Sequence, residues 1–248
     1  MSLRAFRLIT GAAIYAACAL AHVAAQSSHG PDAGVPDTTE QRVVACTSCH
    51  GMHGAGSPDG ASGPRIAGQP AAYLALQLKY FQSGQRKSDA MQYVSQPLTP
   101  AYAREIAEYF AGQAMADGPA KAVAPADNVM QRGADVVLRG DPSRGVPPCA
   151  SCHGRRLTGR EPLVPGLTSL SYKYLASQFA QWRSHSRAAD RPYCMSVVAN
   201  RMSEAEVDAA ARWLANRQPA EVPPPEGSSG NDPPLPDWCV MDNAGAGL

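Results

Sequence analysis

The sequence reads Cys-Thr-Ser-Cys-His at residues 46–50 and Cys-Ala-Ser-Cys-His at residues 149–153. Both stretches match Cys-x-x-Cys-His, which is the attachment signature of a c-type haem. Two thiols three positions apart lie on one side of a helical turn, so both can reach the vinyl groups of one porphyrin. The histidine that follows can then bind the iron. We therefore predict two covalently bound haem c groups, with thioether bonds from Cys46, Cys49, Cys149 and Cys152 and with His50 and His153 as the first iron ligands.

Cysteine pairs with this spacing also occur in zinc sites and in redox-active dithiols. Here the two pairs are 103 residues apart, and each is followed directly by His and Gly. A zinc site or a dithiol would not require that histidine twice. Seven cysteines in 248 residues are also too few for a disulfide scaffold. The haem interpretation is therefore favoured over the other two.

The similarity between the two halves extends beyond these motifs. Equivalent residues recur at offsets of 101 to 104 positions. Solenoid repeats have periods of only about 20–50 residues, so this repeat indicates a duplicated domain. The matched pairs include Tyr73 with Tyr174, Gln77 with Gln178, Phe81 with Trp182, Arg86 with Arg187 and Met91 with Met195.

Apolar residues recur at helical spacing in both halves, and capping signals precede several of these segments. No segment shows the sustained alternation that is typical of strands. The predicted helices cover residues 37–46, 70–83, 99–110, 128–138, 172–184 and 203–214. We therefore predict an all-α fold with a first domain at 37–111, a linker at 112–127, a second domain at 128–217 and a Pro-rich tail at 218–248.

The ligand on the other face of each iron decides between electron transfer and catalysis. Met91 lies 41 residues after His50, and Met195 lies 42 residues after His153. We expect both methionines in loops after the middle helix, where the chain can cross the second face of the porphyrin. A thioether ligand favours Fe(II) and leaves no vacant position on the iron.

Two other histidines compete for this role. His53 is too close to its own attachment motif to reach the opposite face of that haem. His185 has no counterpart in the first half, because Gly84 occupies the equivalent position. We therefore interpret both histidines as surface residues.

Cys194 directly precedes Met195, and its state is open to three interpretations. A disulfide with Cys239 would attach the tail to the second domain. The thiol could also stay free, or a thiolate could bind the iron and lower its potential.

Residues 1–25 have the pattern of a secretory signal peptide: Arg4 and Arg7, an uncharged apolar run over 8–20, and Val23-Ala24-Ala25 before the cleavage site. A second cleavage site after Ala21, an uncleaved anchor and a lipoprotein at Cys18 are the alternatives.

Removal of residues 1–25 changes the formal charge from +1 to −1. Residues 26–36 then form a flexible lead-in, and the mature chain is expected to be soluble in the periplasm of a Gram-negative source, without stable membrane insertion. A charge so near zero argues against nucleic-acid binding.

The chain resembles the dihaem class I cytochromes c, specifically the cytochrome c4 family. The resemblance covers about residues 37–217 and includes Gly-Pro-Arg-Ile-Ala-Gly-Gln at 63–69. It implies two tandem class I cytochrome c domains, each wrapped around one covalently attached haem with His/Met ligation. It also implies that the carbonyls of Pro64 and Pro165 hold the Nδ1–H groups of the two haem-binding histidines.

The family resemblance implies a carrier that takes electrons from a dehydrogenase or a quinol-oxidising complex and delivers them to an acceptor such as a terminal oxidase. Docking to these redox partner proteins is expected to be transient, and no catalytic residue is predicted. One alternative is an enzyme, a dihaem oxidoreductase that acts on a small sulfur substrate through a haem ligated by Cys194. Another is a cytochrome subunit bound permanently to a dehydrogenase complex.

Overall fold

The computed structural model describes residues 37–57, 62–114, 125–187, 194–217, 225–227 and 236–239. The expected signal peptide, the lead-in, most of the linker and most of the tail lie outside these ranges. The chain divides into two units, residues 1–41 and residues 42–248. The described part of the first unit is short: residues 37–41 include the start of helix α2 (Thr39–Arg42).

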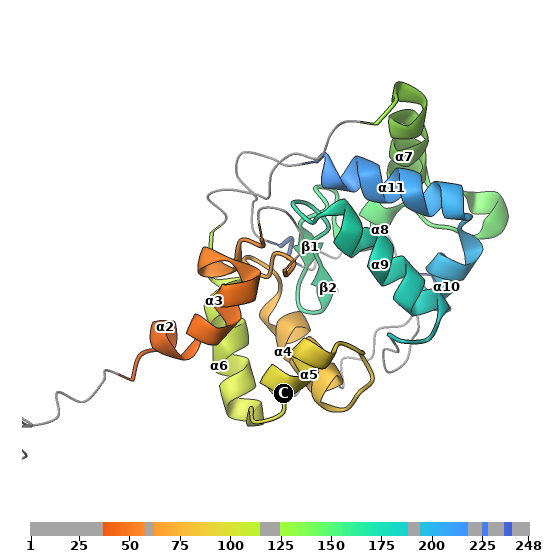
Figure 1. Cartoon of the computed structure of the whole chain (residues 1–248). Coiled ribbons are helices and arrows are strands. Elements are labelled where there is room, and N and C mark those ends of the chain that lie inside the picture. The colour runs from red at the N-terminus through yellow and green to blue at the C-terminus, as the bar shows by residue number, and fades with distance from the viewer. Residues whose placement is uncertain are drawn as a thin grey trace, which may run out of the picture. The chain divides into compact units, whose positions relative to one another are not determined.

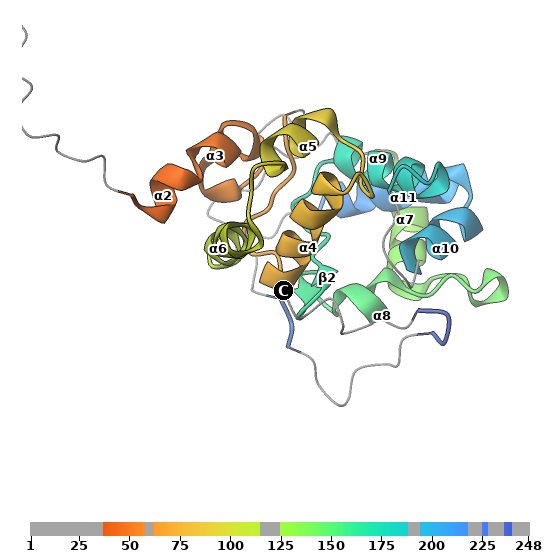
Figure 2. The same ribbon diagram turned by 90° about the horizontal axis from the view of Figure 1, so that it is seen from below.

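The first half of the larger unit consists of helices joined by loops (Figures 1 and 2). Helix α4 packs against α6 and α5. Thr99 caps α6 by accepting a hydrogen bond from Tyr102 N, and Pro100 occupies the first turn. The elements are α3 (Val44–His50), the 3-10 helix η2 (Met52–Gly54), α4 (Ala71–Gln82), α5 (Asp89–Ser95) and α6 (Pro100–Ala111).

The second half repeats this plan and adds a small hairpin. Helix α11 crosses α7, as Figure 1 shows, and they approach so closely that a Cβ on Gly133 would lie 2.3 Å from the Ala209 carbonyl oxygen. Only a glycine fits at that crossing. The elements are α7 (Asp127–Arg139), η3 (Pro142–Arg144), α8 (Cys149–His153), β1 (Gly159–Arg160), β2 (Val164–Pro165), α9 (Tyr172–Arg183), α10 (Cys194–Arg201) and α11 (Glu204–Ala215).

The two halves have very different apolar cores. The first-half cluster contains three buried side chains, Val43, Ile106 and Phe110. Tyr80 and Phe81 are also buried in this half, but outside that cluster. The cluster of the second half contains 16 buried residues, among them Phe179, Trp213 and Leu214. The first half therefore has much less protein core of its own.

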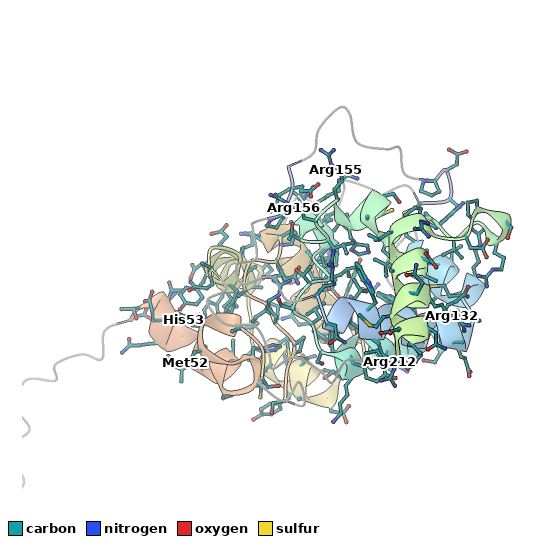
Figure 3. All side chains as sticks on the ribbon, turned by 90° about the horizontal axis from the view of Figure 1, so that it is seen from above. Met52, His53, Arg132, Arg155, Arg156 and Arg212 are labelled. Atoms are coloured by element: carbon teal, nitrogen blue, oxygen red, sulfur yellow. A yellow bond between two sulfur atoms is a disulfide. The ribbon has the colours of Figure 1, made fainter. Side chains whose placement is uncertain are left out.

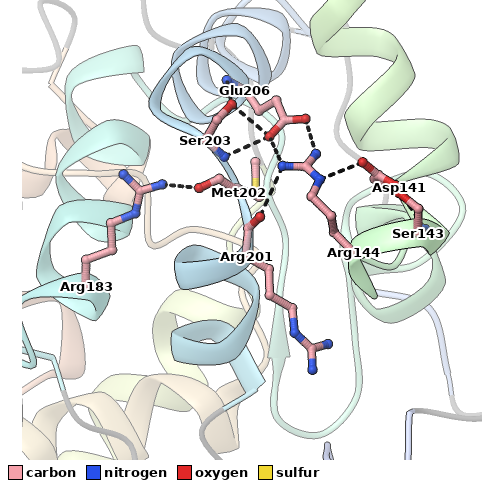
Figure 4. A network of polar contacts seen from close by, with 8 residues as sticks. All are labelled: Asp141, Ser143, Arg144, Arg183, Arg201, Met202, Ser203 and Glu206. Carbon is pink, nitrogen blue, oxygen red and sulfur yellow. Dashed lines mark hydrogen bonds and ion pairs between the residues drawn. The ribbon is translucent and has the colours of Figure 1, made fainter.

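A polar network joins η3 to the junction between α10 and α11 (Figure 4). The Arg144 guanidinium donates two hydrogen bonds to Glu206 and one, of 2.7 Å, to Asp141. Glu206 in turn accepts from Ser203 N at 2.8 Å and completes the capping box of α11. The bond from Arg144 holds the pKa of Glu206 at about 2, so this network stays ionised at neutral pH.

The predicted all-helical fold is confirmed, with three local differences. The expected helix over 37–46 is two helices, divided at Val43, whose side chain turns into the core and is 1% exposed. The β1–β2 hairpin was not predicted, because strands of two residues are too short to alternate. The expectation that Met91 and Met195 lie in loops is wrong, because they lie in α5 and α10. For α5 the physical reason is a capping signal: Ser88 accepts a hydrogen bond from Met91 N and starts the helix.

Within the part of the chain that the structure describes, no helix is long and apolar enough to cross a membrane.

Candidate haem sites

His50 and His153 are held in the same way by their own halves of the chain. The Nδ1–H of His50 donates to the Pro64 carbonyl at 2.7 Å, and that of His153 donates to the Pro165 carbonyl at 2.7 Å. A ring with a protonated Nδ1 keeps its lone pair on Nε2, the atom that is left to bind a metal. Both side chains are buried, and burial lowers the pKa of each below its ordinary value. The imidazoles are therefore neutral, as iron ligation requires.

The four motif cysteines are free thiols on the two short helices α3 and α8. Burial raises the pKa of the Cys46 thiol, and it raises that of Cys149 to about 12. Burial also raises the pKa of the Cys152 thiol. None of the four is paired with another cysteine, so all are available for thioether bonds.

A continuous cavity of about 1470 Å³ contains both sets of candidate residues. Ordinary small-molecule pockets measure about 300–1,000 Å³, so this cavity is large enough for more than one ligand. The candidate residues that line it are Cys46, Cys49, His50, Met91, Cys149, Cys152, His153 and Met195. The structure thus brings together, in each half, every residue that the sequence predicted for the haem site.

The competing histidines lie elsewhere. His53 and His185 are both exposed, and neither is among the residues that line the cavity. Figure 3 shows His53 next to Met52, which is 76% exposed, at the outer side of the first half. Met91 and Met195 are partly buried and line the cavity, so they are the candidates for the second axial position.

The charge of the cavity lining fits haem as well. Among the described residues, the lining contains seven basic side chains and no aspartate or glutamate. A haem brings two propionate carboxylates, which need cationic partners when they are removed from water. The basic residues are Arg42, Arg65, Lys79, Arg86, Lys87, Lys173 and Arg187.

Arg86 and Arg187 form the centre of this basic lining, and each is 7% exposed. Arg86 donates to Gln77 Oε1 at 2.8 Å and to Gln178 Oε1 at 2.8 Å, so it joins the two halves. Arg187 donates to the same two oxygens at 3.1 and 2.7 Å. Tyr174 and Tyr73 complete the network as acceptors. None of these acceptors is a carboxylate, which leaves two buried cations that can pair with propionates.

Two functional residues that break the repeat were not predicted from the sequence. Arg65 is 2% exposed and donates to the Thr168 carbonyl from two nitrogens, at 3.0 and 3.3 Å. Gln69 exchanges two hydrogen bonds, of 2.7 and 3.1 Å, with the backbone of Gly166. Their counterparts in the repeat are Gly166 and Leu170, which cannot make these bonds. A polar residue whose counterpart in the repeat is Gly or Leu was therefore a sequence signal for contacts between the halves.

The structure joins Cys194 to Cys239 in a disulfide with Cα atoms 5.0 Å apart. Cys194 is the first residue of α10, directly before Met195. Cys239 is 4% exposed and, like Cys194, lines the cavity. With its sulfur bonded to Cys239, Cys194 is not available as a thiolate ligand.

Removal of a central cation is expected to lower the reduction potentials. A buried positive charge near an iron favours Fe(II) over Fe(III), so replacing Arg86 or Arg187 with methionine removes that preference while it keeps most of the side-chain volume. Redox titration of the haem-loaded protein, followed by absorbance, measures the shift. Arg132, which is exposed on α7 (Figure 3), provides the control in Arg132→Met. Potentials that stay the same in both cavity variants would contradict this role for the basic lining.

No protein-family model matches the chain. Known proteins nevertheless resemble it over most of its length. A thiosulfate dehydrogenase electron acceptor from Thiomonas intermedia (strain K12) is 37% identical over 173 residues, which are 70% of this chain and 78% of that protein.

Two solved structures are also similar. Reduced recombinant cytochrome c4 from Pseudomonas stutzeri aligns with a TM-score of 0.62 and 27% identity, over 72% of this chain and 96% of that one. A thiosulfate dehydrogenase from Marichromatium purpuratum aligns with a TM-score of 0.62 and 31% identity, over 69% of this chain. The chain spans only 36% of the length of that dehydrogenase. By its two attachment motifs, its duplicated helical fold and these relatives, the chain belongs to the cytochrome c4 family of dihaem class I cytochromes c.

Proposed function

We propose that this dihaem electron carrier accepts electrons from a thiosulfate-oxidising dehydrogenase and passes them to an acceptor such as a terminal oxidase. The observation that carries the proposal is the similarity to a thiosulfate dehydrogenase electron acceptor over 78% of that protein's length. The alignment with 36% of the Marichromatium purpuratum thiosulfate dehydrogenase supports the same donor, because that part of the dehydrogenase has the fold of this chain.

We assign the haem attachment to Cys46 and Cys49 in the first half and to Cys149 and Cys152 in the second. His50 with Met91, and His153 with Met195, would hold the two irons. When bound, the iron supplies a one-electron change between Fe(III) and Fe(II). With the same two side chains holding each iron in both oxidation states, little would have to rearrange when an electron arrives or leaves.

A carrier is favoured over an enzyme by the state of Cys194. The sulfur-oxidising alternative needs a thiolate ligand from that residue, and its sulfur is bonded to Cys239. We therefore propose a protein without catalytic residues of its own, which docks transiently with its donor and acceptor. A small, weak interface is typical of such electron-transfer encounters.

We also propose that the chain works in the periplasm after removal of residues 1–25. Covalent haem attachment and a disulfide both suit an oxidising compartment outside the cytoplasm. The basic start and apolar run of the first 25 residues support the same location.

A reduction assay tests this function. The oxidised, haem-loaded protein is mixed with thiosulfate alone, and then with thiosulfate and a catalytic amount of a thiosulfate dehydrogenase. We expect no reduction by thiosulfate alone and full reduction of both haems once the dehydrogenase is added. Haem absorbance, recorded in a stopped-flow instrument, measures the reduction. Oxidation of thiosulfate by the chain alone would favour the enzyme interpretation, and a chain that stays oxidised with the dehydrogenase would contradict the proposed donor.

A further inference from the structure

We infer that two short pieces of the C-terminal tail, residues 225–227 and 236–239, position both axial ligands of the second haem. We call these two pieces the tail clamp. Residues 225–227 are hydrogen-bonded to the loop that follows His153, and residues 236–239 are bonded to helix α10, which contains Met195. The inference rests on the proposed ligand roles of His153 and Met195.

The first contact of the clamp extends the β1–β2 hairpin. Glu226 N donates to the Gly159 carbonyl at 2.9 Å, and Glu161 N donates to the Glu226 carbonyl at 2.9 Å. Gly159 is paired with Pro165 across the hairpin. The Pro165 carbonyl accepts the hydrogen bond of His153, so this tail residue is connected to the imidazole through Gly159 and Pro165.

The side chain of Glu226 adds a second set of bonds directly after the attachment motif. Its carboxylate accepts from Arg155 N at 3.2 Å and from Arg156 N at 3.0 Å. It lies so close to Gly154 that a Cβ there would be 3.0 Å from Glu226 Cδ. Figure 3 shows Arg155 and Arg156 together at this edge. The carboxylate thus satisfies two backbone donors of the turn that follows His153.

The second contact of the clamp is on the methionine side. Cys239 is bonded to Cys194, the neighbour of Met195 on α10. The Trp238 ring lies beneath the Arg201 guanidinium at the other end of the same helix, 4.9 Å from its carbon. Trp238 and Cys239 both line the cavity together with Met195. The tail therefore holds α10 at both of its ends.

The first half closes its corresponding turn without the tail. There, Gly56 N donates to the His50 carbonyl at 2.7 Å, and a Cβ on Gly51 would meet the Gly56 carbonyl oxygen at 2.5 Å. Met91 is held on α5 by a helix cap from Ser88. Within the described residues, these contacts all come from the first half itself. Loss of the clamp should therefore loosen the methionine of the second haem and leave that of the first unchanged.

Ligand exchange with imidazole tests this inference on the full-length, haem-loaded protein. The variants are the double substitution Cys194→Ser with Cys239→Ser, which cuts the covalent contact, and Glu226→Gln, which keeps the disulfide and removes the carboxylate charge. Glu108→Gln, at an exposed position of α6, is the matched control. Imidazole displaces a weakly held methionine, and its apparent affinity rises with the fraction of open iron.

In each clamp variant we expect the imidazole concentration for half-saturation to fall about tenfold or more at the second haem. The other haem and the control should behave as in the unaltered protein. The strongly shifted methionine methyl signals in the proton NMR spectrum of the reduced protein, assigned with Met195→Ala, show which haem is affected. Unchanged binding in both variants, or equal changes at both haems, would overturn the inference. If the unaltered protein shows no methionine methyl signals, the ligand assignment itself fails instead.

Discussion

Replacing Cys46 and Cys49 with alanine is expected to unfold the first half of the chain, whereas replacing Cys149 and Cys152 should leave much of the second half folded. The difference follows from the two apolar cores. The first-half cluster has only three buried side chains, Val43, Ile106 and Phe110. A domain of this size needs more apolar burial than that, so the porphyrin is a large part of its core.

The second half can keep its structure for the opposite reason. Its cluster of 16 buried residues includes Trp213 and Leu214 of α11, and α11 packs closely against α7. The disulfide between Cys194 and Cys239 adds a covalent restraint that does not depend on haem. Loss of the second haem therefore exposes one side of an existing core.

Limited proteolysis with mass spectrometry, together with the far-ultraviolet helical signal, measures this difference. We expect early cleavage throughout residues 42–114 in the Cys46→Ala and Cys49→Ala variant. The Cys149→Ala and Cys152→Ala variant should give cuts confined to the vicinity of α8. The unaltered haem-loaded protein is the reference for both. Equal protection of the two halves after loss of their haems would show that the core size does not decide their stability.

Replacing Met91 or Met195 with alanine is expected to open one iron at a time. Each substitution should remove about half of the weak sulfur-to-iron absorption band at the edge of the near-infrared in the oxidised protein. It should also lower the potential of that haem by on the order of 0.1 V, within the range of about 0.8 V over which axial ligands set haem potentials. The sign is negative because the thioether favours Fe(II).

Carbon monoxide binding to the reduced protein provides the second measurement. The unaltered protein should bind none, each single variant should bind one equivalent, and the double variant should bind two. Met52→Ala is the control, because Met52 is 76% exposed and outside the cavity. A single variant that keeps the full sulfur band would exclude that methionine as a ligand.

Much of the fold was predictable because the chemistry of haem attachment needs a fixed pattern. The two Cys-x-x-Cys-His motifs and the offsets near 100 residues predict a duplicated helical domain from the sequence alone. The helix starts at Thr99 and Ser203 were also predictable, since a side-chain cap is a local signal. Helix α4 and helix α9 end within one residue of their predicted limits.

Other features were not predictable because they depend on tertiary contacts. Helices α5 and α10 have seven and eight residues, which is too short for a clear amphipathic pattern around Met91 and Met195. The break at Val43 reflects the burial of that side chain and not its local propensity. The bonds of Glu226 join residues about 70 positions apart, and nothing in the Pro-rich tail indicates them.

We propose that each half of the mature chain carries one haem, bound through two thioether bonds. Intact-mass spectrometry of the exported protein, denatured and treated with a disulfide reductant, tests it most directly because only covalently attached haem survives these conditions. We expect the mass of the processed polypeptide plus two haem groups. A mass without haem, or with one haem on a protein matured in a competent host, would contradict it.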